Sequence, residues 1–260
     1  MKRFVGDIRK YAYFSLYAAK TDLKAEVANS YLNWVWWVLE PLCNMLVYYY
    51  VFGSLLDNTQ QYYIVFIYIG LLLWVFFNKT LIYSVKLVRT NREIVTKVYV
   101  PKFILLFSNM MLNGIKLLIS LGILAVMMIG LKVPVSMNIF YIIPIFFVLF
   151  LLTFGLGCNL LHFGVFIDDL SYAITIIFNM LFFLSGVFYD IETTLKAPLG
   201  NILARINPVA VLINSMRNAL LYQKVPDFQI LGIWCLISIV LCCIGVRTIY
   251  KNENSYVKVV

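Results

Sequence analysis

The chain has 260 residues, of which 63% are hydrophobic and 13% are charged, and its formal net charge is +9. Soluble domains contain roughly 45–50% apolar and about 25% charged residues, so this composition excludes a soluble globular protein and indicates an all-α, multi-spanning membrane protein. Lysines and arginines cluster at the ends of the apolar runs, which indicates topology signals and contacts with membrane lipids and argues against nucleic-acid binding.

Residues 1–30 are predicted to form an amphipathic helix that lies in the interface of the inner leaflet. Basic residues precede an uncharged run, residues 11–19, as they do in a signal peptide. The run has only about nine residues and is rich in tyrosine, and Asp7 lies in its basic flank, so we do not expect cleavage.

Six transmembrane helices are predicted, because six apolar runs come close to or exceed the roughly 20 residues that cross a hydrocarbon core of about 30 Å. They cover residues 34–56, 62–84, 103–131, 139–163, 170–188 and 230–246 of a single domain, residues 1–260. The turn at residues 57–61 has no lysine or arginine, whereas basic residues are frequent before the first span. The positive-inside rule therefore predicts that both termini are cytoplasmic.

The polar face of the first span carries candidate functional side chains. They recur at intervals of three and four residues, which places them on one face of a helix: Trp37, Glu40, Asn44, Tyr48 and Phe52. A carboxylate exposed to lipid costs several kcal/mol, so this face should meet protein or water. It either holds the helix bundle together through interhelical hydrogen bonds or lines a transport pathway.

The segment at residues 91–102, between the second and third spans, is the densest positive cluster outside the N-terminus, together with Lys86 and Arg89. Such a segment is retained in the cytoplasm. Pro101 lacks a backbone donor and restricts Val100, so one element must end before another begins. We expect a short helix along the cytoplasmic face, suited to contact with a soluble partner.

Residues 189–228 are too polar to cross a membrane and too apolar to be a plain loop. Asn207-Pro208 divides this region, and the second piece, residues 209–222, has about 14 residues, too few to cross. We therefore expect a re-entrant or interfacial helical hairpin in the outer leaflet. Arg205 and Arg217 flank its second helix and could meet lipid phosphates or a phosphate on a substrate.

No catalytic, cofactor or metal site is predicted for this chain, because it has neither a phosphate-binding G-x-x-x-x-G-K-[ST] loop nor an H-E-x-x-H pattern. His162 is interpreted as a packed or interfacial histidine, with a proton relay as the alternative, and Lys116 as a lysine that snorkels to the inner interface. The five cysteines lie in apolar runs and are interpreted as small hydrophobic residues: Cys43, Cys158, Cys235, Cys242 and Cys243.

Several stretches together resemble the membrane subunit of polysaccharide ABC exporters of the ABC-2 type, the family that moves O-antigen and teichoic acid precursors. These stretches are residues 30–42, 51–53, 70–74, 91–102 and 182–189, with Asn207-Pro208 and Arg217. The chain departs from the family pattern in two places. Asn33 stands where glycine is usual, and Asp168-Asp169 stands where Arg-Asp is common.

The resemblance implies a homodimer whose two six-helix halves enclose a channel, with a cytoplasmic ATPase subunit bound to each half. ATP and magnesium would bind to that partner. The residues implied to couple the two subunits are Asn91, Arg92, Glu93, Lys97, Tyr99, Pro101 and Lys102. The outer hairpin would form the external gate, with Tyr189, Arg205 and Arg217 as candidates. The abundant aromatic rings, 17% of the chain, could stack on sugars without a fixed register.

The function expected from the residues and the resemblance is ATP-driven export of a lipid-linked cell-surface polysaccharide across the bacterial plasma (inner) membrane. The chain itself would not be an enzyme. The alternatives are a drug or lipid exporter of the ABC-2 type, and a passive channel or scramblase. The chemical identity of the glycan and its charge are left open by the sequence.

Overall fold

The computed structural model describes residues 2–28, 31–55, 60–194 and 198–259, and these residues form helices and no strand. The elements in chain order are α1 (Lys2–Ala28), the 3-10 helix η1 (Asn33–Val35), α2 (Trp36–Leu55), α3 (Tyr63–Thr90), α4 (Arg92–Lys97), α5 (Lys102–Gly130), the 3-10 helix η2 (Met137–Tyr141), α6 (Ile142–Phe166), α7 (Leu170–Leu184), α8 (Ile191–Thr194), α9 (Leu199–Ile206), α10 (Pro208–Leu220) and α11 (Phe228–Val259).

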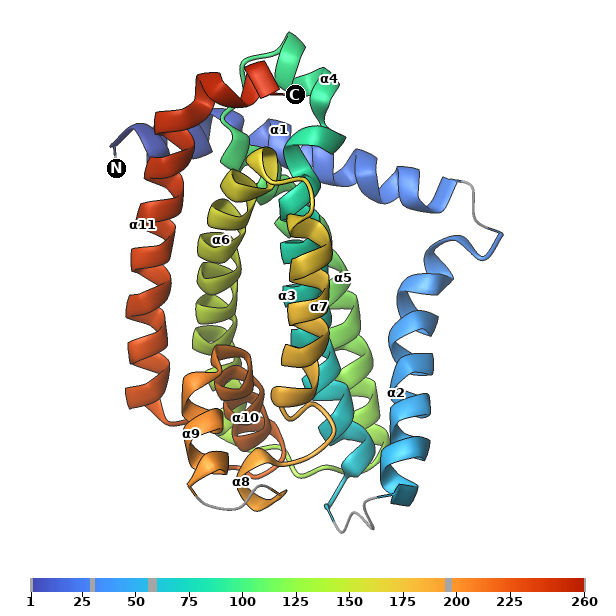
Figure 1. Ribbon diagram of the computed structural model, residues 1–260. Helices are drawn as coiled ribbons and strands as arrows, with labels where there is room; N and C mark the ends of the chain where they lie inside the picture. The colour runs from blue at the N-terminus through green and yellow to red at the C-terminus, as the bar shows by residue number, and fades with distance from the viewer. Residues whose placement is uncertain (1, 29–30, 56–59, 195–197, 260) are drawn as a thin grey trace.

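The long helices run along one common direction, and the short ones gather at the two ends (Figure 1). α1 lies across one end, beside α4 and the C-terminal part of α11. We call this the basic end. At the opposite end, α8, α9 and α10 form a compact group beneath α6 and α7. The basic end and the group of α8, α9 and α10 thus lie at opposite ends of the bundle.

Four segments are long and apolar enough to cross a membrane: Tyr63–Thr90, Lys102–Gly130, Met137–Phe166 and Phe228–Tyr256. They correspond to four of the six predicted spans. α7 is apolar but has only 15 residues. α2 has 20 residues, and its run of tyrosines together with Glu40 and Asn44 lowers its hydropathy. These two helices run beside the four candidate spans.

α3 is the central helix of the bundle. In its most apolar window 78% of the residues are buried, against 17% for α11. α3 contacts α2, α5, α6, α7 and α10, so the main core forms around it. Glycines on α6 permit the close approach of neighbouring helices, as the sequence indicated. A Cβ atom at Gly164 would collide with the Val85 carbonyl of α3, and one at Gly155 would lie 2.9 Å from the Cys242 backbone nitrogen of α11.

Three helices end at other residues than the predicted spans. The second span was predicted to end at residue 84, and α3 continues to Thr90. The fifth was extended to residue 188, but α7 ends at Leu184, after which Gly186 adopts a positive φ of 65°. The residues after 246 were expected to be a short polar tail, but α11 continues to Val259, because Ile249 and Tyr256 share a face that is buried against the bundle.

Asn207-Pro208 separates α9 from α10, as predicted, and α8 is a further short helix before α9. The Asn207 side chain accepts hydrogen bonds from the backbone N–H groups of Val209 and Ala210, and Pro208 occupies the first turn of α10. The same side chain donates to Ser185 Oγ at 2.9 Å. Asn207 therefore both starts α10 and ties it to the turn after α7.

Candidate functional site

The candidate coupling segment, residues 91–102, lies at the basic end (Figure 1). Asn91 separates α3 from α4, since its side chain donates to the Leu87 carbonyl and its backbone leaves the helical region. The short helix predicted from the sequence is α4. Its charged residues Arg92, Glu93 and Lys97 are exposed, and Val95 is buried against the bundle. α4 is thus anchored by Val95 and the partly buried Ile94, and it offers charged side chains to solvent.

The linker after α4 is held by the two ends of the chain, and we call this arrangement the Tyr99 clamp. The Tyr99 hydroxyl accepts a hydrogen bond from Arg3 Nη2 at 2.8 Å and donates one to Glu253 Oε2 at 2.9 Å. The Tyr99 carbonyl accepts a bond from the Tyr11 hydroxyl. α1, the linker and the end of α11 therefore meet at a single phenol.

The electrostatics of the Tyr99 clamp favour the protonated phenol. Burial raises the pKa of Tyr99, the bond to Glu253 raises it further, and Arg3 opposes the shift. The second carboxylate oxygen of Glu253, Oε1, is buried and has no hydrogen-bond partner among the described residues. Pro101 and Lys102 follow directly, both buried, and the Lys102 ammonium lies 5.9 Å from the Tyr99 ring centroid. Positive charge therefore lies on two sides of the ring.

A second charged contact ties the basic end of α3 to the loop between α6 and α7. Arg89 forms an ion pair with Asp168 and donates to the Val165 carbonyl at 3.1 Å. Asp168 is the first residue of the Asp-Asp pair that departs from the family pattern. The aspartate thus has a cationic partner from another helix.

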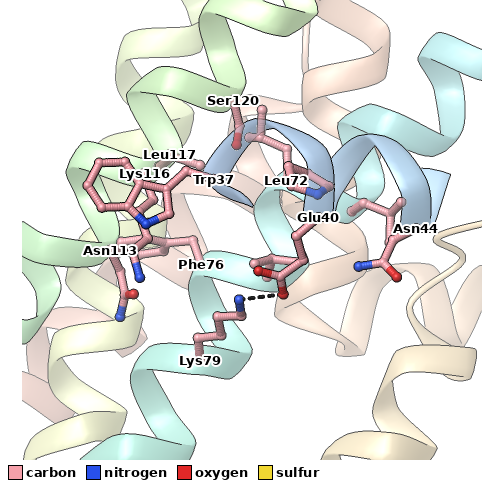
Figure 2. Close-up of a pocket in the computed structure, with 13 residues that line it drawn as sticks. Trp37, Glu40, Asn44, Leu72, Phe76, Lys79, Asn113, Lys116, Leu117 and Ser120 are labelled. Carbon is pink, nitrogen blue, oxygen red and sulfur yellow. Dashed lines mark hydrogen bonds and ion pairs between the residues drawn. The ribbon is translucent and has the colours of Figure 1, made fainter. Parts of the chain in front are cut away.

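The candidate pathway face of α2 divides into two parts. Trp37, Glu40 and Asn44 line a pocket between α2, α3 and α5, whereas Tyr48 and Phe52 do not. Figure 2 shows the Glu40 carboxylate pointing toward the Lys79 ammonium, and the two atoms are 2.7 Å apart. The cavity measures about 60 Å³, which is room for a few water molecules and too little for a sugar ring.

Each of the three helices contributes polar or charged side chains to the wall of the pocket. Lys116 of α5 forms an ion pair with Glu26 of α1 at 2.5 Å, and the Glu26 side chain is exposed, so the lysine reaches a carboxylate at the surface. Asn113 donates to Thr80 of α3 and to Asn109. In this structure the α2 polar face makes interhelical contacts, which is one of the two roles that its spacing predicted.

Tyr48 and Phe52 belong to an aromatic cluster that joins α2 to the turn after α7. The Phe52 and Phe188 rings stack with centroids 4.3 Å apart, and Tyr48 lies 4.8 Å from Phe188. Phe182 extends the cluster toward Trp74 of α3. Aromatic pairs at these distances contribute about 0.5–1.5 kcal/mol each beyond burial.

At the opposite end, Arg217 lies inside the protein. Its side chain is buried, and it donates to the carbonyl oxygens of Phe66, Gly186 and Val187 at distances between 2.7 and 3.2 Å. The guanidinium also lies 3.3 Å from the Phe66 ring centroid. It therefore faces carbonyl groups here and not a phosphate, and it links α10 to α3 and to the turn after α7.

Arg205 and Tyr189 are placed differently. The Arg205 side chain is exposed in the last turn of α9, and its carbonyl accepts a bond from the Trp234 indole. Tyr189 is half-buried and donates to the Phe183 carbonyl at 2.7 Å. Arg205 is thus free to meet a phosphate at the surface, whereas the hydroxyl of Tyr189 is already bonded.

Sequence reasoning missed several partners. Glu253 was not singled out, and Asp7 was considered only as an acidic residue in the basic N-terminal flank, although it lies one helical turn after Arg3 and forms an ion pair with it. His162 accepts or donates a bond with the Tyr256 hydroxyl at 2.8 Å, which agrees with a packed histidine. The helical spacing of Ile249 and Tyr256 was the available signal for the extension of α11.

Comparison with known proteins identifies the family. The model of the ABC-2 type transporter family matches residues 17–221. The chain belongs to the ABC-2 type transporter family. It is similar to the O-antigen export system permease protein RfbA of Myxococcus xanthus, with 25% identity over 243 residues that cover 93% of each chain. It is also similar to a protein of the same name from Klebsiella pneumoniae, with 22% identity over 92% of this chain and 91% of the relative. Family and apolar helices together make this chain a multi-pass membrane protein.

Proposed function

We propose that this chain is the transmembrane subunit of an ATP-driven exporter that moves a lipid-linked cell-surface polysaccharide, such as O-antigen, across the bacterial inner membrane. The observation that carries this proposal is the similarity to O-antigen export permeases along 93% of both chains. The resemblance in residues 91–102 and 182–189 supports the same class of substrate. The chain would supply the path, and a separate ATPase subunit would bind ATP and magnesium.

The coupling segment is proposed as the docking surface for that ATPase. α4 carries exposed charges of both signs. The side chain of Glu93 is 89% exposed and that of Lys97 is 74% exposed, so the ion pair between them contributes little to stability. These side chains are therefore available to a partner. The linker behind α4 is held by the Tyr99 clamp, so displacement of α4 would reach α1 and α11 through hydrogen bonds.

The polymer path is proposed to form between two copies of the chain. The cavity beside Glu40 is too small for a sugar, so a path within one copy has no support. α2 and α7 carry large exposed apolar and aromatic side chains: Leu46, Tyr50, Tyr172, Ile176, Met180 and Phe183. A second copy would cover part of these faces and leave aromatic rings to contact sugar. The complex would contain two permease and two ATPase subunits.

In this proposal α2 and α7 complete six transmembrane helices, and α9 and α10 form a re-entrant hairpin in the outer leaflet. The basic end, with α1 at the interface and both termini beside it, faces the cytoplasm. Lys20, Lys24 and the charges of α4 support this orientation. Accessibility labelling of single cysteines in α4 and in the α9–α10 turn would test it, because the two positions should label from opposite sides.

Transport in membrane vesicles tests the function. Inverted vesicles containing the chain and its ATPase receive a radiolabelled lipid-linked glycan, and we expect glycan to enter the lumen only with hydrolysable ATP. Entry without nucleotide would favour a passive channel or scramblase. ATP-driven uptake of lipid or drug without glycan would favour the other exporter class. A copurifying ATPase with a two-to-two stoichiometry would support the assembly independently.

A further inference from the structure

An apolar groove lies where α1 meets α6 and α11 near the basic end. Its volume is about 540 Å³, and Phe4 of α1, Leu151 of α6 and a row of α11 residues line it. The α11 residues run from Ile239 to Tyr250 at intervals of three and four, so they form one stripe along the helix. The volume falls within the roughly 300–1,000 Å³ of small-molecule sites.

Almost all polar atoms in the groove wall are already bonded or lie at one end of it. The Cys242 thiol donates to the Leu151 carbonyl at 3.2 Å, and the Tyr250 hydroxyl donates to Asp7 at 2.5 Å. What remains is hydrocarbon, the exposed thiol of Cys243, and two guanidinium groups, those of Arg3 and Arg247. A ligand for this groove must combine a long apolar part with an anionic group.

The two arginines differ in their available charge. Arg3 lies 3.8 Å from Asp7 and 3.9 Å from Glu253, so its charge is shared with two carboxylates. Arg247 is exposed and makes no hydrogen bond or ion pair with any described residue. Arg247 is therefore the uncompensated cation of the groove and the stronger candidate to bind an anion.

The position of Arg247 along α11 matches the depth of a lipid phosphate. At about 1.5 Å per residue, Arg247 lies about 28 Å beyond Phe228, where α11 begins. A hydrocarbon core is about 30 Å thick, so if Phe228 is at one boundary Arg247 is at the other. The stripe from Ile239 to Val246 then lies within the hydrocarbon, directly below the guanidinium.

The groove faces outward from the bundle. Only 17% of the most apolar window of α11 is buried inside the chain, so this side of the helix is open to whatever surrounds the protein. In a membrane, that surrounding is lipid. A bilayer phospholipid meets every requirement: an acyl chain for the stripe, and a phosphate for Arg247.

We propose that this groove is a binding site for one anionic phospholipid of the surrounding bilayer. Its phosphate binds Arg247, Arg3 completes the positive end, and one acyl chain lies along the α11 stripe. Because Arg3 also donates to Tyr99, the bound lipid joins the assembly of α1, the linker and α11. This site is independent of the exported substrate and of the polymer path.

Lipid binding to the purified permease tests the proposal. The detergent-solubilised chain, with its ATPase if it copurifies, is titrated with phosphatidylglycerol or phosphatidylcholine, and bound lipid is counted by native mass spectrometry. We expect one phosphatidylglycerol to bind more tightly than phosphatidylcholine. Arg247→Gln should weaken phosphatidylglycerol about fivefold, because a basic side chain near the membrane surface contributes about 1 kcal/mol.

Two further variants separate the contribution of the Arg247 charge to lipid binding from that of the shape of the groove. Lys251→Gln removes a neighbouring exposed cation that does not line the groove, and we expect it to leave the preference unchanged. Cys243→Trp narrows the apolar part, and we expect weaker binding of phosphatidylglycerol with Arg247 intact. Equal binding of the two lipids, or equal losses in Arg247→Gln and Lys251→Gln, would overturn the proposal. Displacement of phosphatidylglycerol by a polyprenyl phosphate at stoichiometric concentration would also overturn it, in favour of a substrate site.

Discussion

The Tyr99 hydroxyl donates a hydrogen bond to the Glu253 carboxylate across 2.9 Å, and so joins the linker after α4 to the last turns of α11. The two residues are 154 positions apart in the chain. The same oxygen accepts a bond from Arg3. The Tyr99 phenol therefore links the segment after α4 to residues near both ends of the chain.

Replacement Tyr99→Phe removes both side-chain bonds and keeps the ring. We expect a loss of about 1–2 kcal/mol in stability, because the Glu253 carboxylate and the Arg3 guanidinium each lose a partner. If the Tyr99 clamp transmits the conformational change of the ATPase to the permease, the amount of glycan transported per ATP hydrolysed should fall several-fold in vesicles. Tyr13→Phe is the matched control, because Tyr13 is 80% exposed on α1 and makes no side-chain hydrogen bond with the described residues. An unchanged ratio in Tyr99→Phe would argue that the clamp is only structural.

Arg217 should be a stability determinant. Arg217→Ala leaves the carbonyls of Phe66, Gly186 and Val187 without their donor, and we expect a loss of about 3 kcal/mol or more, measured as a lower Tm in detergent. Arg217→Lys should recover only part of this, because an ammonium cannot reproduce the planar fork.

Arg205→Ala is the comparison for this pair, since its side chain is exposed and should change stability by about 0.5 kcal/mol or less. A Tm for Arg217→Ala close to that of Arg205→Ala would contradict the buried arrangement. If Arg217 instead serves the substrate, transport would fail in Arg217→Lys at an unchanged Tm.

Gly164→Ala should separate α3 from α6, because the added Cβ would collide with the Val85 carbonyl. Overpacking of this kind costs about 1–3 kcal/mol. Gly122→Ala on α5 provides the opposite case, since no atom lies within 4 Å of its Cβ position. It should be neutral or stabilising by about 0.5–1 kcal/mol, as expected for a helix interior. The Tm of Gly164→Ala should therefore fall below that of the parent, whereas the Tm of Gly122→Ala should not. A Tm for Gly164→Ala at or above that of the parent would refute the close contact.

The ion pair between Glu40 and Lys79 should contribute little energy. Both side chains are about half-exposed, 50% and 42%, so a double-mutant cycle of Glu40→Gln and Lys79→Gln should give a coupling free energy of about 1 kcal/mol or less. A coupling well above 2 kcal/mol would mean that the pair is desolvated, for example by a second copy of the chain. A loss of transport without loss of stability in Glu40→Gln would instead favour a role in the pathway.

The positions of the four helices that are long and apolar enough to cross a membrane could be predicted from the sequence, because hydropathy is a local property. Asn207-Pro208 and the glycines of α6 also carried local signals, a cap with a first-turn proline and a stripe of small residues. No local sequence signal pointed to the partners of Lys116 and Tyr99. Glu26 and Glu253 meet them only after helices far apart in the chain are packed, so no spacing rule reaches these contacts. Arg217 was expected to meet a phosphate for the same reason, since the carbonyls that surround it come from α3 and from the turn after α7.

The continuation of α11 to Val259 has a practical consequence for anyone who shortens or extends this protein. Deletion of the residues after Val246 would remove Glu253, which accepts a hydrogen bond from Tyr99, and Tyr256, which is hydrogen-bonded to His162. It would also remove Arg247. An affinity tag fused at either end of the chain would lie near α4, where the ATPase subunit is proposed to dock.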